Sequence, residues 1–254
     1  MVSSPATLKD SAHIKRLQDN RDFGTYDMVE WIRDLIRPRR NDKMLDLGCG
    51  TGEQLMRLSE KLGPAGSAVG IDKSRKAIAV FQENLRKRER SSVKAVCGDI
   101  RDFRKHTGDT IFDICMSNFA FYYVKDKGKV ISDVREALSK KGRFFVSGPM
   151  CHNNYEFIQL HSSVVGTDPS RFYPRFMEDE ILPLVRKKYA DVSTSIFRNP
   201  VNFPSAQSLM EYWRNYYLFR PESESDFAKE VKKIFRTQKA FTTVKEVIGI
   251  LATS

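Results

Sequence analysis

The fold is decided by residues 44–52, which read MLDLGCGTG. An apolar run here leads into three glycines at alternate positions, Gly48, Gly50 and Gly52, and a helical pattern begins directly after them. Glycine permits a positive φ and lets a ligand approach the backbone where a Cβ would clash. We therefore expect a strand, a tight loop and a helix, with a small molecule held at the carboxyl end of the strand.

Around this loop, short apolar runs alternate with helical stretches. The predicted strands are 43–47, 67–71, 93–96, 112–117 and 142–147, and the predicted helices are 53–62, 73–87 and 129–138. Such alternation is typical of a parallel sheet with crossover helices on both faces. The sequence therefore predicts an α/β protein with a doubly wound sheet.

The chain is predicted to have three parts. Residues 1–40 form a helical lead-in or lid that ends at Pro38, and residues 41–150 form the ligand-binding core. Residues 151–254 belong to the same domain. They hold a sixth strand at 191–197, an aromatic-rich helix near 205–219, and a last segment at 242–251 whose pattern fits a strand or a helix.

The residues around the glycines exclude the common phosphate sites. In a dinucleotide fingerprint, G-x-G-x-x-G/A, the third glycine position would be Glu53, whose carboxylate would repel a pyrophosphate. A P-loop GK[ST] sequence is absent from the chain. Asp46, two residues before Gly48, suits a cationic part of a ligand better than a phosphate.

Two further acids follow the next two predicted strands. Asp72 lies 20 residues after Gly52, where a carboxylate can accept hydrogen bonds from both hydroxyls of a ribose. The alternative for Asp72 is an acid that opposes a helix dipole. Asp99 follows the third strand and can accept from the exocyclic amine of an adenine. Together with the glycine loop, these acids predict a nucleoside site without phosphates.

Five segments in consecutive order carry a resemblance to a known family. They read MLDLGCGTG, VGID, GDI, FDICMSNFAFYYV and LSKKGRFFVSG, between about residues 43 and 148. They closely resemble the class I S-adenosylmethionine-dependent methyltransferases. The resemblance implies a Rossmann-like, seven-stranded, mostly parallel sheet whose last strand is antiparallel. It also implies that residues 148–241 carry an α-helical insertion over the substrate, and that 242–251 form the closing strand.

The resemblance further implies S-adenosyl-L-methionine as the cofactor. Asp46 and the loop backbone would hold its methionine part and its ammonium; the loop residues counted here are Gly48, Gly50, Thr51 and Gly52.

For the rest of the cofactor, the resemblance implies that Asp72, with Lys73 beside it, takes the ribose. Asp99 and Ile100 would frame the adenine. Asn118, at the end of the fourth strand, would lie near the amino-acid part or the reacting methyl group.

The sequence contains no catalytic triad, and methyl transfer needs none. The sulfonium of the cofactor already activates the methyl group, so the protein mainly aligns a nucleophile. A general base matters only when the acceptor must lose a proton. His152 and His161 are the candidate bases, Tyr122 is a candidate for positioning the acceptor, and Tyr26 for closing over the cofactor. Structural roles are the alternative for each of these four side chains.

The charge balance leaves several partners open. Lys and Arg number 43 and Asp and Glu 32, a net charge of +11 that either attracts an anionic partner or only maintains solubility. The leading hypothesis is methyl transfer to an oxygen or nitrogen of a small molecule, whose carboxylate or phosphate would meet arginines of the insertion. The alternatives are a nucleic-acid methyltransferase and a non-catalytic cofactor-binding homologue. Against the first, residues 117–121 lack the [DNS]PPY motif of base amino-methylating enzymes.

The remaining expectations concern location and assembly. No stretch approaches the roughly 18 to 20 uncharged apolar residues of a membrane span. Four scattered cysteines, without CxxC or zinc-finger spacing, predict a reducing cytoplasmic location and no metal site. A monomer and a homodimer both remain compatible with the sequence.

Overall fold

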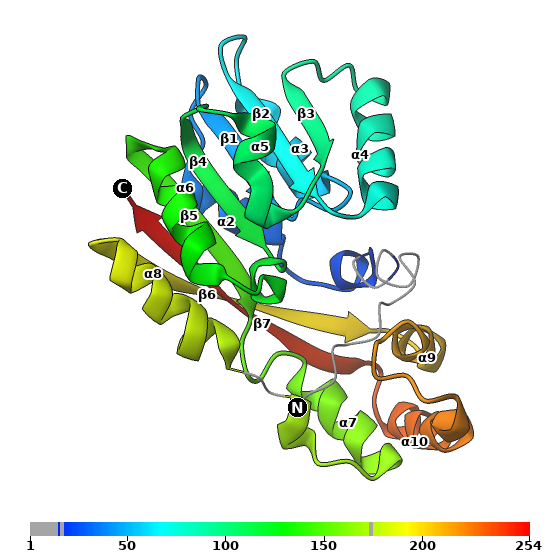
Figure 1. Ribbon diagram of the computed structural model, residues 1–254. Helices are drawn as coiled ribbons and strands as arrows, with labels where there is room; N and C mark the ends of the chain where they lie inside the picture. The colour runs from blue at the N-terminus through cyan, green and yellow to red at the C-terminus, as the bar shows by residue number, and fades with distance from the viewer. Residues whose placement is uncertain (1–14, 16–17, 173–174) are drawn as a thin grey trace. The chain divides into compact units, whose positions relative to one another are not determined.

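A seven-stranded sheet organises the structure, in the order β3-β2-β1-β4-β5-β7-β6 (Figure 1). The strands are β1 Lys43–Leu47, β2 Ser67–Asp72, β3 Val93–Cys97, β4 Phe112–Asn118, β5 Leu138–Pro149, β6 Asp191–Phe203 and β7 Phe241–Thr253. β1 to β5 pair in parallel, and β7 runs antiparallel to β5 with Phe145 opposite Leu251. The predicted doubly wound sheet is confirmed, and residues 242–251 form a strand.

The coordinates are a computed structural model, which describes residue 15 and residues 18–172 and 175–254. The chain falls into two units. The core unit consists of Met28–Met150, Arg175–Phe197 and Val247–Ser254. The second unit consists of Met1–Asp27, Cys151–Pro174 and Arg198–Glu246. Most of the surplus of basic residues belongs to the core unit.

The helices of the core unit cover both faces of its sheet. They are α2 Met28–Ile36, α3 Glu53–Leu58, α4 Arg75–Lys87, α5 Phe103–Thr107, α6 Lys127–Ala137 and α8 Leu182–Lys188. α3, α4 and α6 confirm the predicted helices with small shifts at their ends. α3 ends earlier than expected because the chain tightens into a 3-10 turn at Ser59–Lys61.

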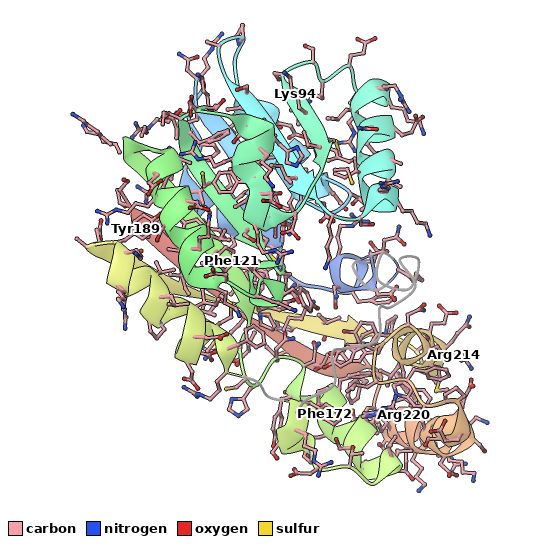
Figure 2. The ribbon with its side chains drawn as sticks, viewed as in Figure 1. Lys94, Phe121, Phe172, Tyr189, Arg214 and Arg220 are labelled. Atoms are coloured by element: carbon pink, nitrogen blue, oxygen red, sulfur yellow. The ribbon has the colours of Figure 1, made fainter. Side chains whose placement is uncertain are left out.

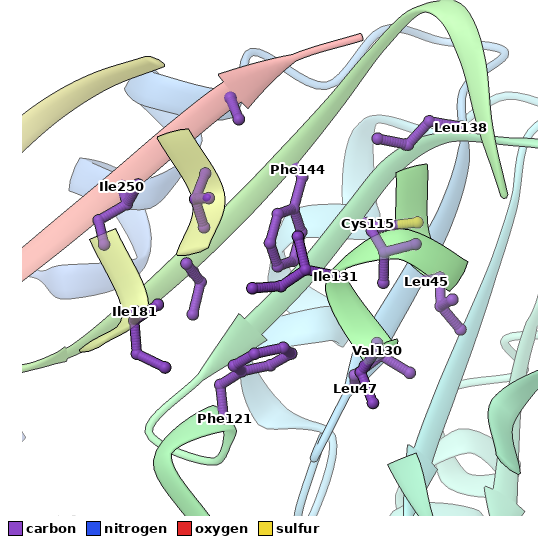
Figure 3. Packing of buried hydrophobic residues seen from close by; sticks show 14 of the residues in the cluster. Leu45, Leu47, Cys115, Phe121, Val130, Ile131, Leu138, Phe144, Ile181 and Ile250 are labelled. Carbon is purple, nitrogen blue, oxygen red and sulfur yellow. The ribbon is translucent and has the colours of Figure 1, made fainter. Parts of the chain in front are cut away.

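Alternation along the strands builds two apolar layers, because successive side chains point to opposite faces. Leu45, Cys115 and Phe144 pack with the buried faces of α5, α6 and α8. Their neighbours Met44, Met116 and Phe145 pack with α2, α3 and α4. Figure 3 shows the first layer, where Phe121 and Phe144 meet edge to face with ring centroids 5.9 Å apart. Burial of each such phenylalanine contributes about 1.5–3 kcal/mol.

The second unit has an aromatic core of its own. Its helices are α7 Tyr155–Val165, α9 Ala206–Arg214 and α10 Glu224–Thr237. Trp213 of α9 stacks on Phe227 of α10 with ring centroids 4.0 Å apart. Tyr212 is also fully buried, so this part of the aromatic helix packs the core. α9 ends at Arg214, five residues before the predicted end of that helix.

Within the second unit, Gly24 forms an antiparallel bridge to Val201.

None of the helices that the structure describes has the length and apolar character needed to span a lipid bilayer.

Candidate cofactor site

The loop between β1 and α3 adopts a conformation that glycine alone adopts readily. Gly48, Gly50 and Gly52 have φ angles of 85°, 55° and 74°. The N–H groups of Gly48 and Cys49 donate to the carbonyl oxygen of Ile71, at 2.8 and 3.2 Å. These bonds tie the loop to β2, so the three glycines form a rigid turn at the carboxyl edge of the sheet.

The three glycines differ in the space around them. A Cβ on Gly48 would lie 2.2 Å from the Cβ of Ala120, and one on Gly52 would lie 2.2 Å from the ring of Phe81. Around Gly50 no described atom lies within 4 Å of that position. Two glycines are therefore required by packing, whereas Gly50 presents its backbone to open space that a ligand can enter.

Asp72 links this loop to the second and third strands. Its Oδ2 accepts from the Gly50 N–H at 2.9 Å, and its Oδ1 accepts from the Ser74 N–H at 2.8 Å. Its carbonyl oxygen accepts from the N–H of Gly98 at 3.0 Å. A carboxylate oxygen has a second lone pair, so Asp72 is held in place beside Gly50 with acceptor capacity left for hydroxyl groups.

Asp46 and Asn118 are buried polar residues with unsatisfied atoms. The Asp46 side chain is 2% exposed, and its Oδ1 has no hydrogen-bond partner among the described residues. Asn118 accepts from the Ser147 hydroxyl at 2.7 Å, but its buried Nδ2 finds no partner in the same part of the chain. Buried polar groups normally find partners. At this sheet edge, Asp46 Oδ1 lacks a donor and Asn118 Nδ2 lacks an acceptor among the residues described. An amino-acid ligand fits both, because its ammonium can donate to Asp46 and its carboxylate can accept from Asn118.

Burial controls the protonation of Asp46. Desolvation, together with a smaller contribution from the negative charge of Asp72, raises its pKa to about 8. The group is therefore protonated at neutral pH until a cation approaches. An ammonium beside Asp46 would restore the carboxylate.

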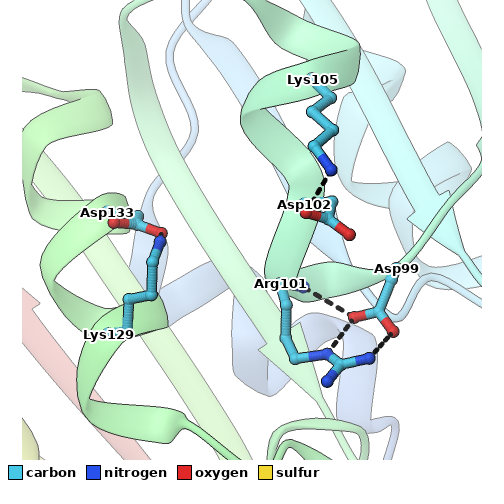
Figure 4. A network of polar contacts seen from close by, with 6 residues as sticks. All are labelled: Asp99, Arg101, Asp102, Lys105, Lys129 and Asp133. Carbon is cyan, nitrogen blue, oxygen red and sulfur yellow. Dashed lines mark hydrogen bonds and ion pairs between the residues drawn. The ribbon is translucent and has the colours of Figure 1, made fainter.

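The pKa of Asp99 shifts in the opposite direction, because Asp99 is paired with Arg101 (Figure 4). Its Oδ1 accepts from the backbone N–H of Arg101 at 2.8 Å and from Nε at 3.0 Å, and its Oδ2 accepts from Nη2 at 2.8 Å. These bonds lower the pKa of Asp99 to about 2, with Lys73 making a smaller contribution. Asp99 is thus a permanent carboxylate at the exposed edge of the site. Next to it, Ile100 Cδ1 would lie 3.4 Å from a Cβ on Gly48.

An aromatic cluster stands beside the glycine loop. Ala120 packs against Gly48, and the turn Phe121–Tyr123 follows it directly. The ring of Tyr122 lies 4.5 Å from that of Tyr123 and 4.6 Å from that of Phe176, between centroids. Tyr123 is 62% exposed. At the start of this turn Phe119 has φ 56°, a strained conformation for a bulky side chain and typical of functional sites.

The structure thus brings most of the predicted cofactor residues to one edge of the core unit: Asp46, Gly48, Gly50, Thr51, Gly52, Asp72, Lys73, Asp99, Ile100 and Asn118. Their individual contacts with the cofactor stay predictions. Tyr122 belongs to the same unit. Tyr26, His152 and His161 belong to the second unit, and their roles also stay predictions.

Of these three, Tyr26 is exposed, and its backbone N–H donates to Asn199 Oδ1 at 2.8 Å. His152 is exposed, and its Nδ1 lies 3.4 Å from the Cys151 sulfur. His161 is buried and accepts from the Trp213 indole at 3.1 Å. Burial lowers the pKa of His161 to about 4, with a smaller contribution from the charge of Arg220, which is labelled in Figure 2.

Sequence reasoning missed four residues that shape the site. Ala120 and Phe81 close on two of the glycines, Arg101 pairs with Asp99, and Phe176 completes the aromatic cluster. Arg101 had a local signal, since it lies two residues from an acid. Phe81, Ala120 and Phe176 approach the site only through the fold, so no spacing in the sequence indicates them.

Comparisons with known proteins identify the family of the chain. A family model described as a methyltransferase domain matches residues 38–185. The demethylmenaquinone methyltransferase of Geobacillus stearothermophilus is 25% identical over 207 residues, covering 80% of this chain and 82% of that enzyme. The nocamycin O-methyltransferase of Saccharothrix syringae is 29% identical over 136 residues, which cover 50% of this chain. They cover 48% of that enzyme, so the chain spans about half its length.

Among solved structures, the plantazolicin methyltransferase BpumL in complex with SAH aligns with a TM-score of 0.55 at 18% identity, over 99% of this chain and 91% of that one. This likeness concerns the fold. Together with the family match, it leads to one conclusion: the chain belongs to the methyltransferase-domain family and is a class I enzyme that uses S-adenosyl-L-methionine.

Proposed function

We propose that the protein transfers a methyl group from S-adenosyl-L-methionine to an oxygen or nitrogen of a small-molecule acceptor by in-line displacement. Two observations carry the proposal together: the buried Asp46 oxygen without a partner among the described residues, and the open space at the backbone of Gly50. When bound, the cofactor supplies a methyl group activated by a sulfonium.

Different residues of the core unit bind different parts of the cofactor in this proposal. Asp46 accepts from the ammonium, and the amide of Asn118 donates to the amino-acid carboxylate. Asp72 accepts from the ribose hydroxyls, because Gly50 and Ser74 already orient both of its oxygens. Asp99 and Ile100 border the adenine. Lys73 and Thr51 complete the rim of this site.

The acceptor side is supported by relatives and by exposed aromatic surface. The two relatives named above are enzymes for demethylmenaquinone and nocamycin. Tyr123 offers an exposed ring, backed by Tyr122 and Phe176, directly after the segment that covers Gly48. We therefore propose a largely apolar acceptor with a planar group that packs against these rings.

The bound cofactor would supply its methyl group to the acceptor's lone pair, and S-adenosylhomocysteine would be the leaving group. A proton on the acceptor oxygen or nitrogen then leaves to a base or to water. Of the two histidines, His152 is the better candidate for this base, since the pKa of His161 is about 4 and its Nδ1 already accepts from Trp213.

The test has two stages. Calorimetric titration with S-adenosylhomocysteine should give saturable binding, and Asp46→Ala should remove it. Labelled S-adenosylmethionine is then incubated with phenols, quinols, carboxylic acids and amines, and Tyr123→Ala should raise the KM of the best acceptor more than it lowers kcat. Binding without transfer to any small acceptor, but with transfer to RNA, would overturn the proposed acceptor class.

A further inference from the structure

The core unit has a basic pocket away from the glycine loop, where α2 ends and β1 begins. A cavity of about 360 Å³ is lined by Arg33, Asp34, Arg37, Pro38 and Lys61. A second cavity of about 560 Å³ adjoins it, shares Asp34 and Arg37 with it, and is also lined by Arg39 and Arg143. Both open at the amino end of the strand whose carboxyl end carries the cofactor loop.

The backbone around the pocket is held by long-range hydrogen bonds. The Gly63 N–H donates to the carbonyl oxygen of Arg40 at 2.6 Å, and the Ser67 N–H donates to that of Asp42 at 3.2 Å. These bonds fix the turn after Lys61 against the segment that follows α2. Arg37 has φ 45°, a left-handed conformation that this packing maintains at some cost.

Some of the basic side chains already have partners. Arg143 donates to the carbonyl oxygens of Ile36 and Arg37 and pairs with Asp42, so it neutralises the negative end of the α2 dipole. Arg33 pairs with Glu30 and donates to the Arg57 carbonyl oxygen at 2.8 Å.

Other cationic groups have no acidic partner in the part of the chain that the structure describes, although Arg37 Nε donates to the backbone carbonyl oxygen of Asp34 at 3.2 Å. The buried Nε of Arg33 has no acceptor among the described residues. Arg37 and Lys61 are exposed, and no acidic side chain within the described part of the chain pairs with either. Asp34 also lines the pocket and reduces its positive potential, but it is one exposed acid against three cations.

We propose that this pocket binds the phosphate group of a small phosphorylated ligand. A guanidinium presents paired donors that match phosphate oxygens, and a lysine adds a compact positive charge. The exposed side chains of Arg37 and Lys61 would supply these donors. The larger adjoining cavity would hold the organic part of the ligand.

The test uses inorganic pyrophosphate as the probe and the full-length chain at low ionic strength. Calorimetry should detect saturable binding to the unmodified protein. The variant Arg37→Gln/Lys61→Gln should weaken it at least tenfold, because both exposed cations are removed. The matched control, Arg186→Gln/Lys187→Gln, removes the same charge from exposed positions of α8 and should leave the affinity within twofold.

Further readouts distinguish this proposal from the proposed function. Affinity for S-adenosylhomocysteine and the thermal midpoint should be unchanged in both double variants, so a folding defect or a failure of the cofactor site would be visible separately. Equal losses of pyrophosphate binding in the two variants would overturn the pocket, since net charge alone would then explain it. Absence of binding to the unmodified protein would overturn it as well. So would much tighter binding of a single-stranded oligonucleotide that both variants weaken equally.

Discussion

Two buried aspartates lie at opposite ends of the same short strand, Asp42 just before β1 and Asp46 within it, and their surroundings are opposite. Asp42 precedes β1 and is 7% exposed; its Oδ2 accepts from the Arg39 N–H at 2.9 Å and from Arg143 Nη2 at 2.7 Å. Asp46 lies near the other end of β1 and is 2% exposed, and its Oδ1 has no partner in the described chain. Only three residues separate an aspartate whose oxygen has partners from one whose oxygen has none within the described ranges.

The difference shows how one strand serves two purposes. A buried charge costs free energy unless it is paired, so Asp42 with its arginine holds α2, β1 and β5 together. An unpaired group such as Asp46 reduces stability, and it is retained where a ligand supplies the missing partner. The amino end of β1 therefore stabilises the fold, and binding is the role that we propose for its carboxyl end.

The largest effect is expected at the amino end. Asp42→Ala leaves Arg143 without its buried partner and should reduce the free energy of unfolding by about 3–5 kcal/mol. Urea denaturation measures this loss. Asp109→Ala, an exposed acid of the same unit, is the control and should change stability by less than about 0.5 kcal/mol. A loss below about 1 kcal/mol for Asp42→Ala would contradict the structural role.

At the carboxyl end of β1, loss of an aspartate should weaken cofactor binding. Asp46→Asn removes the carboxyl group that we propose to meet the cofactor ammonium, and a hydrogen bond between charged groups contributes about 1.5–3 kcal/mol. The dissociation constant of S-adenosylhomocysteine should rise by roughly ten- to a hundredfold. Calorimetry measures this change. If affinity stayed within twofold, Asp46 would not touch the ammonium.

The stability of Asp46→Asn should depend on pH in a defined direction. The folded pKa of Asp46 is about 8, above its unfolded value of 3.8, so between these values the folded protein binds one proton more than the unfolded chain. Stability from this group is complete below pH 4 and falls by about 1.4 kcal/mol per pH unit as pH rises towards 8. The asparagine variant lacks this term. Its stability relative to the unmodified protein should therefore grow from pH 5 to pH 8 in denaturation series, and a constant difference would contradict the raised pKa.

The smallest effect concerns two glycines of the loop. Gly50→Ala places a Cβ in open space at a positive φ, so it should cost only about 1–2 kcal/mol of stability while hindering the cofactor. Gly52→Ala meets the Phe81 ring at 2.2 Å and should cost clearly more. Thermal unfolding with and without S-adenosylhomocysteine separates the two effects. If S-adenosylhomocysteine raised the thermal midpoint of Gly50→Ala as much as that of the unmodified protein, Gly50 would have no special role in binding.

The sequence predicts the carboxyl end well because its signals are local. Three alternating glycines and acids after successive strands lie within short spacings, and the structure has them at one sheet edge. The ion pair of Asp42 with Arg143 joins residues 101 positions apart, and the contact between Gly48 and Ala120 joins distant segments. Such pairs depend on tertiary closure, which no spacing encodes.

The ends of helices and strands also depend on tertiary contacts, so the sequence predicts them less well. The sequence predicts that the sixth strand stops at residue 197, shortly before Pro200, but β6 continues to Phe203. β6 is an edge strand, and proline is tolerated there because an outward amide needs no partner. The aromatic run up to Phe219 suggests a longer α9, whereas Tyr216 leaves the helix and packs its ring 4.8 Å from that of Phe157.

The most direct test of the cofactor site measures protons. S-adenosylhomocysteine is titrated into the protein at pH 7 in buffers that differ in ionisation enthalpy, and the heats give the number of protons released. Because Asp46 is protonated before binding and ionised beside the ammonium, close to one proton should be released, and Asp46→Asn should release none. Equal heats in all buffers for the unmodified protein would contradict the account.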